Sequence, residues 1–148
     1  MEAIIFIGIQ ASGKSSFYFE RFSNSHIRLN LDMLKTRNRE TILLNACIEA
    51  KQPVVIDNTN ATKDDRKRYI EILKRSHFQT IGYYFKSSID ECLHRNKMRE
   101  VTEKIPQIGV KGTYNKLVLP EYSEGFDELY YVSISDEGFN VEGWINEV

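Results

Sequence analysis

The stretch GIQASGKS, at residues 8–15, constrains the fold more than any other part of the sequence. It follows the apolar run AIIFI and precedes KSSFYFERF, an order that indicates a buried strand, a tight loop and a helix. The spacing GxxxxGK followed by Ser or Thr is that of a phosphate-binding loop, in which backbone N–H groups face phosphate oxygens. A chance match in a chain of this length has a frequency well under about one in a hundred. The chain is therefore predicted to bind a nucleotide.

The residue types in this loop suit the binding of a nucleoside triphosphate with Mg²⁺. Lys14 would reach the β- and γ-phosphates and act in catalysis by neutralising the transferring charge, and the hydroxyl of Ser15 would ligate Mg²⁺. The expected ATP contacts from the loop are Gly8, Ala11, Ser12, Gly13, Lys14, Ser15 and Ser16. A glycine-rich turn without a ligand is the structural alternative.

Length and composition favour one globular domain, since 41% of the 148 residues are hydrophobic. No apolar run reaches the roughly 18 residues of a membrane span, and the N-terminus lacks a secretory pattern. The expected protein is soluble and cytoplasmic, with no membrane partner. Cys47 and Cys92 form no CxxC pair, which favours buried reduced thiols. The three histidines lack metal-ligand spacing, which argues against structural zinc.

Charge is unevenly distributed along the chain, whose net charge is −1. Residues 95–116 carry six basic and two acidic side chains, whereas residues 117–148 carry eight acids and no Lys or Arg. A basic working surface followed by an acidic segment fits this pattern, and so does a solvated surface with accidental clustering. The near-neutral total argues against a general nucleic-acid binder.

Apolar runs alternate with helical patterns along the chain, which predicts a parallel sheet covered on both faces. The strand candidates are residues 3–7, 26–30, 54–57, 80–85 and 128–134. The helix candidates are residues 14–22, 33–51, 62–77 and 88–99, with a short helix after Pro106. Thr62 and Ser88 are expected N-caps, and the acidic remainder after the fifth strand is expected to be a terminal extension. The prediction is one α/β domain.

Two aspartates follow predicted strands, at the sheet edge where ligands bind in parallel α/β folds. Asp32 could accept the proton of an attacking hydroxyl, but it could equally cap the helix that follows. Asp57 closes the strand VVID, where it could hold Mg²⁺ directly or through water, and a turn aspartate is the alternative.

Four further segments, NLDML, VVIDNTN, RNKMRE and LPEYSEGFDELYYV, together resemble the 5′-kinase domain of the polynucleotide kinase family. The likeness is greatest to the kinase half of animal polynucleotide kinase/phosphatases and covers nearly the whole chain. The most specific features are VVIDNTN followed by Arg66 and Arg68, and the EGF turn at residues 124–126.

The resemblance implies a P-loop kinase domain over residues 1–148, with a five-stranded sheet in the order 2-3-1-4-5 and a lid at about residues 95–116. It implies ATP with Mg²⁺ as donor, Asp32 as general base, and Arg95 and Arg99 as lid arginines on the ATP phosphates, Arg99 acting in catalysis. Without the resemblance, RNKMR would be a solvated basic face, although arginines four apart share one helix face.

The acceptor implied by the resemblance is the 5′-hydroxyl of DNA or RNA. The family's DNTN element falls on residues 57–60, and Thr59 and Asn60 are the expected acceptor contacts in it. The family often has Arg before the base, where this chain has Leu31. Phage members hold the acceptor phosphate with Arg three residues after the base; here the candidates are Lys35, which lacks the guanidinium fork, and Arg37.

Two other functions are compatible with the sequence. One is a P-loop kinase for a small metabolite or nucleoside, which fits the near-neutral charge. The other is a nucleotide-binding module without catalysis, in which Asp32 would have no task. The length leaves no room for the family's phosphatase or ligase domains, so a kinase module alone is expected, and no partner protein can be inferred.

Overall fold

Six strands form one sheet in the computed structural model, which describes residues 1–101 and 104–145. Its spatial order is β2-β3-β1-β4-β5-β6. The strands are β1 (Glu2–Ile7), β2 (Ile27–Leu29), β3 (Val54–Ile56), β4 (Gln79–Phe85), β5 (Glu128–Ser135) and β6 (Gly138–Gly143). The first five pair in parallel, so the predicted order 2-3-1-4-5 is confirmed, with one strand added.

The added strand corrects the expectation of an acidic terminal extension. β6 pairs antiparallel with β5 through a tight turn at Gly138, whose φ of 110° suits glycine. Phe139 lies opposite Ile134 and Val141 lies opposite Val132. The ring of Phe139 packs on that of Phe17, with 5.1 Å between the two ring centroids. Phe139 and Val141 alternate with Asn140 and Glu142, which is the pattern of an edge strand, and the acids Asp136 and Glu137 lie in the turn before β6.

The helices connect the strands as predicted, with one exception. They are α1 (Lys14–Arg21), α2 (Leu31–Leu34), α3 (Arg37–Ala50), α4 (Lys63–Arg75), α5 (Ile89–Lys97) and α6 (Gln107–Lys116), followed by the 3₁₀ turn η1 (Tyr122–Glu124). The N-caps at Thr62 and Ser88 are confirmed.

The single helix predicted over residues 33–51 is wrong, because the structure has two. Lys35 ends α2 with a φ of 74°, outside the helical region. Thr36 then starts α3, its hydroxyl accepting a hydrogen bond from the backbone N–H of Arg39 at 3.1 Å. A threonine cap satisfies an N–H that a continuous helix would have bonded internally.

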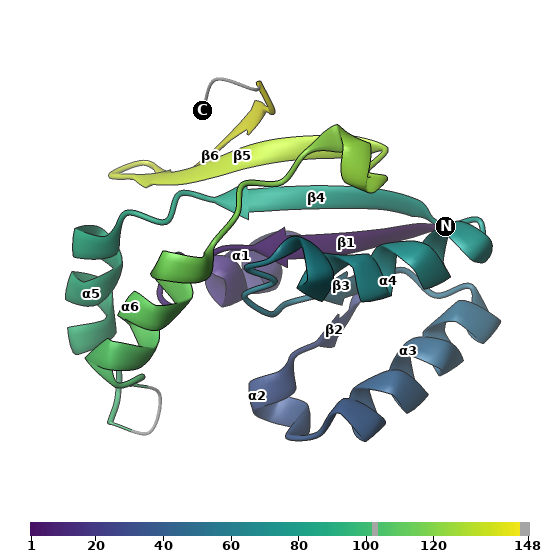
Figure 1. The fold of residues 1–148 in the computed structure, drawn as a ribbon, viewed down its shortest axis with the longest axis horizontal. Helices are drawn as coiled ribbons and strands as arrows, with labels where there is room; N and C mark the ends of the chain where they lie inside the picture. Colours follow the sequence, from purple (N-terminus) through teal and green to yellow (C-terminus); the bar gives the residue numbers. More distant parts are fainter. Residues whose placement is uncertain (102–103, 146–148) are drawn as a thin grey trace.

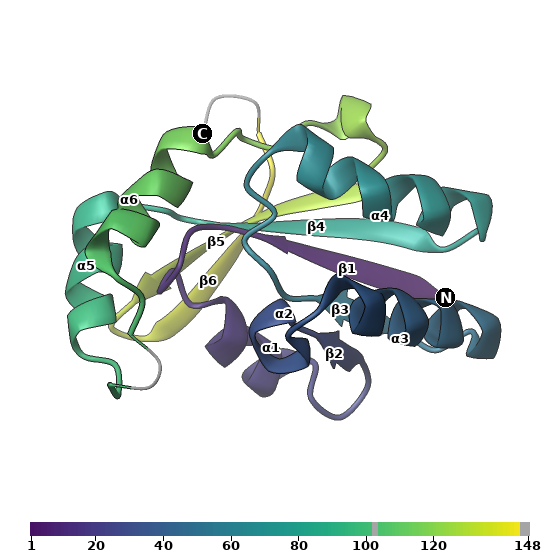
Figure 2. The same ribbon diagram turned by 60° about the horizontal axis from the view of Figure 1, so that its bottom comes forward.

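Two apolar layers enclose the sheet. Phe17 and Tyr18 of α1 pack on one face, and residues of α3 and α4, including Leu44 and Leu73, pack on the other. α5 and α6 lie side by side at the end toward which β1 and β4 run (Figures 1 and 2). Cys47 and Cys92 are buried and free, as predicted, and burial raises the pKa of each thiol. Within the described ranges, no helix is both long and apolar enough to cross a membrane.

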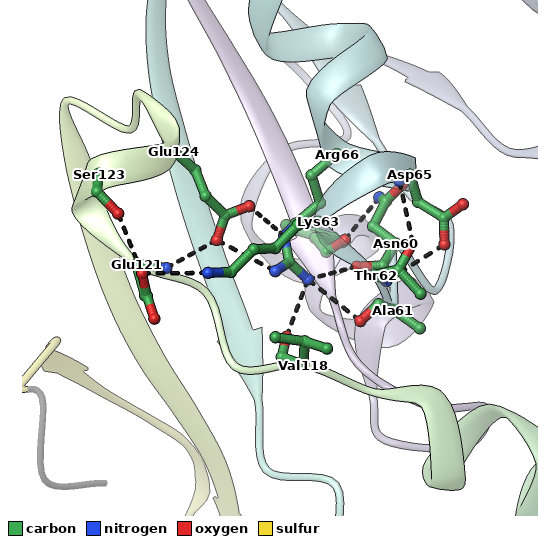
Figure 3. A network of polar contacts seen from close by, with 11 residues as sticks. Asn60, Ala61, Thr62, Lys63, Asp65, Arg66, Val118, Glu121, Ser123 and Glu124 are labelled. Atoms are coloured by element: carbon green, nitrogen blue, oxygen red, sulfur yellow. Dashed lines mark hydrogen bonds and ion pairs between the residues drawn. The ribbon is translucent and has the colours of Figure 1, made fainter.

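Arg66 of α4 joins three segments that are distant in sequence (Figure 3). Its guanidinium donates to both carboxylate oxygens of Glu124, at 2.8 and 3.1 Å. It also donates to the backbone carbonyls of Asn60 at 2.9 Å, Ala61 at 3.3 Å and Val118 at 3.0 Å. The side chain has no solvent exposure. These bonds fix the segment after β3, where the carbonyl of Thr59 accepts from the N–H of Gly8 in the predicted phosphate loop at 3.0 Å.

Candidate functional site

A pocket lies at the carboxyl ends of β1, β2 and β3, where the predicted site residues converge. It is lined by Gln10, Ala11, Gly13, Lys14, Ser15, Ser16, Asn30, Asp32, Asp57, Asn58, Thr59 and Arg99. These residues come from three strand ends and from the segment after α5. The pocket therefore combines the phosphate loop with both aspartates and one of the two predicted lid arginines.

The loop from residue 8 to residue 15 has the conformation that its glycines permit. Gly13 caps α1 with a φ of 102°, and a Cβ there would lie 2.9 Å from Cδ1 of Ile134. A Cβ on Gly8 would lie 2.7 Å from the hydroxyl of Ser12. Gly8 and Ser12 do not line the pocket; Ser12 is buried, and the N–H of Gly8 donates to the carbonyl of Thr59. Gly8 and Ser12, both predicted to contact ATP, therefore stabilise the conformation of the loop and do not face the pocket.

Lys14 folds back into the loop. Its ammonium donates to the carbonyls of Gly8 at 2.9 Å and Ile9 at 2.7 Å. Burial lowers the pKa of Lys14 to about 8, an effect that the negative charge of Asp57 opposes. The ammonium also donates to the hydroxyl of Ser12 at 3.4 Å, and no carboxylate among the described residues forms an ion pair with it.

Ser15 and Asp57, the predicted metal ligands, are in contact. The hydroxyl of Ser15 donates to Oδ2 of Asp57 at 3.0 Å. Asp57 is 1% exposed, yet its Oδ1 has no hydrogen-bond partner in the part of the chain that the structure describes. A buried carboxylate oxygen without a protein partner is a position that a water molecule or a bound cation can occupy.

The donor set fits Mg²⁺. A hydroxyl and a carboxylate are hard oxygen ligands, and Mg²⁺ is usually held by one or two carboxylates with phosphates and water completing its shell. No group of three or more His, Cys, Asp or Glu side chains that could hold a metal occurs among the described residues. A cage made of protein ligands alone is therefore not seen there.

Arg28 of β2 completes this cluster, and it was not among the predicted site residues. Its Nε donates to Oδ2 of Asp57 at 2.8 Å, and its Nη2 donates to the hydroxyl of Ser15 at 2.9 Å. The available signal was an arginine within the short apolar strand HIRLN, because a strand arginine near the core needs an anionic partner.

Asp32 lies in the first turn of α2 with its side chain exposed. The alternative that it caps a helix is wrong. Asn30 is the cap of α2, accepting from the N–H of Met33 at 3.0 Å, and Thr36 caps α3. Asp32 lines the pocket, and its carboxylate makes no hydrogen bond or ion pair with another described residue.

The two predicted lid arginines do not share a helix face. Arg95 lies in α5, and its Nε donates to the carbonyl of Ala11 at 2.6 Å, outside the pocket lining. α5 ends at Lys97 with Met98 as its cap, so Arg99 lies beyond the helix and reaches the pocket. The helix expected over residues 88–99 therefore ends two residues earlier than predicted, at Lys97.

The predicted acceptor contacts divide into two groups. Thr59 lines the pocket, whereas Asn60, Lys35 and Arg37 do not. Asn60 is buried, and its amide donates to the carbonyl of Phe6 at 2.8 Å. Arg37 donates to buried Glu40 at 3.0 Å and to the hydroxyl of Tyr69 at 2.7 Å. Lys35 is exposed at the end of α2.

Residues 34–112, just over half of the chain, match the AAA domain family. The matched segment starts after the phosphate loop and runs from the end of α2 into α6.

Two curated proteins are similar over most of the chain. The bifunctional polynucleotide phosphatase/kinase of Schizosaccharomyces pombe is 30% identical over 86% of this chain and 32% of its own length. The putative bifunctional polynucleotide phosphatase/kinase of Acanthamoeba polyphaga mimivirus is 28% identical over 89% of this chain and 33% of its own length. The chain thus spans about a third of these relatives. They confirm the resemblance that the sequence motifs predicted.

Solved structures share the fold. Kti12 of Chaetomium thermophilum, in complex with ADP-AlF3, superposes with a TM-score of 0.66 at 14% identity, over 90% of each chain. A gluconokinase of Sinorhizobium meliloti 1021 superposes with a TM-score of 0.59 at 17% identity, over 91% of this chain and 83% of its own. At such identities the likeness shows the fold alone, and it confirms the predicted P-loop kinase fold.

Proposed function

The chain belongs to the AAA domain family, and we propose that it is an ATP-dependent kinase that transfers the γ-phosphate to the 5′-hydroxyl of DNA or RNA. One observation carries the proposal. A single pocket is lined by the phosphate-loop residues Lys14 and Ser15, by buried Asp57 and by exposed Asp32. Phosphoryl transfer needs these groups together, because it depends on positioning and on neutralising charge around the γ-phosphate.

The donor phosphates would lie along the loop. Backbone N–H groups of residue 11 and residues 13–16 would face the phosphate oxygens at the N-terminus of α1. The ammonium of Lys14 would exchange its carbonyl partners for the β- and γ-phosphates. Ser15 and Asp57 would hold Mg²⁺, which when bound would neutralise charge on the β- and γ-oxygens. Gly8 and Ser12 would act through the shape of the loop.

Asp32 would be the general base. Its carboxylate faces the pocket without a hydrogen-bond or ion-pair partner among the described residues, so both oxygens can accept the proton of an attacking hydroxyl. Asn30, two residues before Asp32, donates from its side-chain amide to the carbonyl of Asp57 at 2.6 Å. The base is therefore tied to the strand end that carries the proposed metal ligand.

Residues 95–116 would form the lid, of which residues 102 and 103 lie outside the described residues. Arg99 would contact the transferring phosphate from the pocket wall. Arg95 would act differently, by holding the carbonyl of Ala11 and so the outer turn of the phosphate loop.

The polynucleotide acceptor is supported by the names of the curated relatives. Thr59 would contact the acceptor directly because it lines the pocket. Lys35 would meet the next phosphate from the end of α2, while Asn60 would support Thr59 through its bond to Phe6. Arg37 would have to release Glu40 and Tyr69 before it could reach the acceptor.

Transfer of labelled γ-phosphate from ATP to a panel of acceptors tests this function. The panel contains 5′-hydroxyl DNA and RNA oligonucleotides, nucleosides and sugars. We expect labelling of the oligonucleotides, with a Michaelis constant that rises with salt because phosphate contacts release counterions. Asp32→Asn should lower turnover by about 10²-fold or more while leaving ATP binding intact. Asp64→Asn, a change of an exposed acid on α4, is the matched control and should keep wild-type turnover.

Two outcomes would contradict the proposal. Labelling of nucleosides or sugars in preference to oligonucleotides would make the chain a metabolite kinase. ATP binding without transfer to any member of the panel would make it a nucleotide-binding module.

A further inference from the structure

The guanidinium of Arg28 occupies the space beside the two proposed metal ligands. It bonds Oδ2 of Asp57 and the hydroxyl of Ser15 at the same time, at 2.8 and 2.9 Å. Its position follows from the sheet, because β2 pairs in parallel with β3 and places Arg28 opposite Val55, two residues before Asp57. A fork of donors that spans two partners fixes their separation as well as their orientation.

Aromatic rings hold Arg28 from α1. Its guanidinium carbon lies 5.3 Å from the ring centroid of Phe19 and 5.9 Å from that of Tyr18. Phe19 is 59% exposed, and its ring contacts both the guanidinium of Arg28 and the ring of Tyr18, whose centroid lies 5.3 Å away. The arginine is thus fixed on one side by rings and on the other by a buried anion.

The hydrogen bonds of this cluster leave two oxygen positions open. Ser15 uses its proton toward Asp57 and one lone pair toward Arg28, so one lone pair remains. Oδ1 of Asp57 has no partner within the described part of the chain. A cation could take these two positions while Arg28 keeps both of its bonds.

Charge determines when a cation can enter. Asp57 and Arg28 neutralise each other, and the charged side chains that line the pocket besides Asp57 are Lys14, Arg99 and Asp32. A divalent cation alone would add two positive charges beside two buried or half-buried cations, Lys14 and Arg28. The triphosphate of ATP would reverse this balance, because it carries more negative charge than one Mg²⁺ removes.

We propose that Arg28 is a positioning residue that holds Ser15 and Asp57 in place before the metal arrives and prevents a divalent cation from binding without a nucleotide. The inference rests on the proposed Mg²⁺·ATP site, but it concerns the order of binding and not the transfer reaction.

Titration with MnCl₂ in the absence of nucleotide tests the proposal, with bound Mn²⁺ read by electron paramagnetic resonance. Arg28→Gln should bind Mn²⁺ at least about tenfold more tightly than the wild type, because a nearby positive charge has been removed. Arg21→Gln is the matched control. The guanidinium carbon of Arg21 also lies over a ring, 5.2 Å from the centroid of Phe17. Arg21 pairs with Glu20, however, and contacts neither of the proposed metal ligands. Its variant should behave as the wild type does.

Melting temperature gives a second readout. Arg28→Gln should melt lower than the wild type in EDTA and be restored by MnCl₂, whereas Mn²⁺ should leave the wild type unchanged. Arg28→Lys keeps the charge and should exclude free Mn²⁺ even if the Gln variant fails to fold. Equal Mn²⁺ affinity in the wild type and in Arg28→Gln, or tight Mn²⁺ binding by Arg28→Lys, would overturn the proposal. Neither ATP turnover nor an acceptor enters the experiment, so its failure is distinct from failure of the kinase function.

Discussion

Two largely buried arginine–carboxylate pairs differ in which of their hydrogen-bonding atoms lack a partner. Arg66 and Glu124 bond through both carboxylate oxygens, and three backbone carbonyls take the other guanidinium contacts. Arg28 and Asp57 bond through one carboxylate oxygen only, and the other has no partner among the residues described. The first pair is complete within the protein, whereas the second leaves room for a ligand.

This difference separates scaffold from site. The Arg66 pair ties α4, the segment after β3 and the segment after α6 into one unit, and nothing further is needed to satisfy it (Figure 3). The Arg28 pair lies beside the phosphate loop, where a buried oxygen without a partner costs stability in the absence of a ligand. We therefore expect changes at Arg66 to affect folding and changes near Arg28 to affect ligand binding.

The largest expected effect comes from breaking the complete pair. Arg66→Met should lower the free energy of unfolding by about 3–5 kcal/mol, because Glu124, only 9% exposed, would lose its charge partner. Urea denaturation measures the change. Arg68→Met is the matched control on the same helix, at an exposed position, and should change stability by less than about 0.5 kcal/mol. Similar losses in the two variants would mean that the Arg66 network does not stabilise the fold.

A smaller effect is expected at the candidate site, where ATP binding should depend on pH through Lys14. Lys14 is buried as Arg66 is, but no described carboxylate pairs with its ammonium, and its pKa is lowered to about 8. ATP phosphates would favour the protonated form, so the dissociation constant for ATP should rise above about pH 8, by up to about tenfold per pH unit. Fluorescence titration across pH 7–10 measures this, and Lys14→Ala should bind weakly with no such rise. A flat profile for the wild type would contradict the role of Lys14.

The same pKa has a second consequence, for the protein without nucleotide. The unfolded lysine keeps its proton up to its ordinary value of 10.5, whereas the folded one loses it near 8. Between these values the unfolded chain binds more protons, so the contribution of Lys14 to the free energy of unfolding increases with pH.

The fold was largely predictable from the sequence because its signals are local. The apolar runs, the glycine loop and the caps at Thr62 and Ser88 each depend on residues within a few positions of one another. The break at Lys35 was missed because α2 and α3 read as one helical pattern, and only the cap geometry of Thr36 separates them. β6 was missed because it has only two large apolar residues, Phe139 and Val141, and follows the acidic turn at Asp136 and Glu137.

The site was predictable where a motif fixes the chemistry, and not where the contact is tertiary. Lys14, Ser15 and Asp57 belong to local patterns, and the structure brings them into one pocket. Arg28 contacts Asp57 across 29 positions, and Arg95 contacts Ala11 across 84 positions. The spacing of residues within one segment cannot predict such pairs, because they depend on the strand order and on how α5 packs against the phosphate loop.

The central claim is that the Arg28–Asp57 pair belongs to a ligand site and the Arg66–Glu124 pair to the scaffold. The most direct measurement is the rise in melting temperature that ATP causes with Mg²⁺ and with EDTA, in Asp57→Asn and in Glu124→Gln. We predict that Glu124→Gln melts lower without ligand but keeps the wild-type gain from Mg²⁺, whereas Asp57→Asn keeps most of its stability and loses that gain. The claim would be contradicted if the Mg²⁺-dependent rise in melting temperature remained in Asp57→Asn, or if it disappeared in Glu124→Gln.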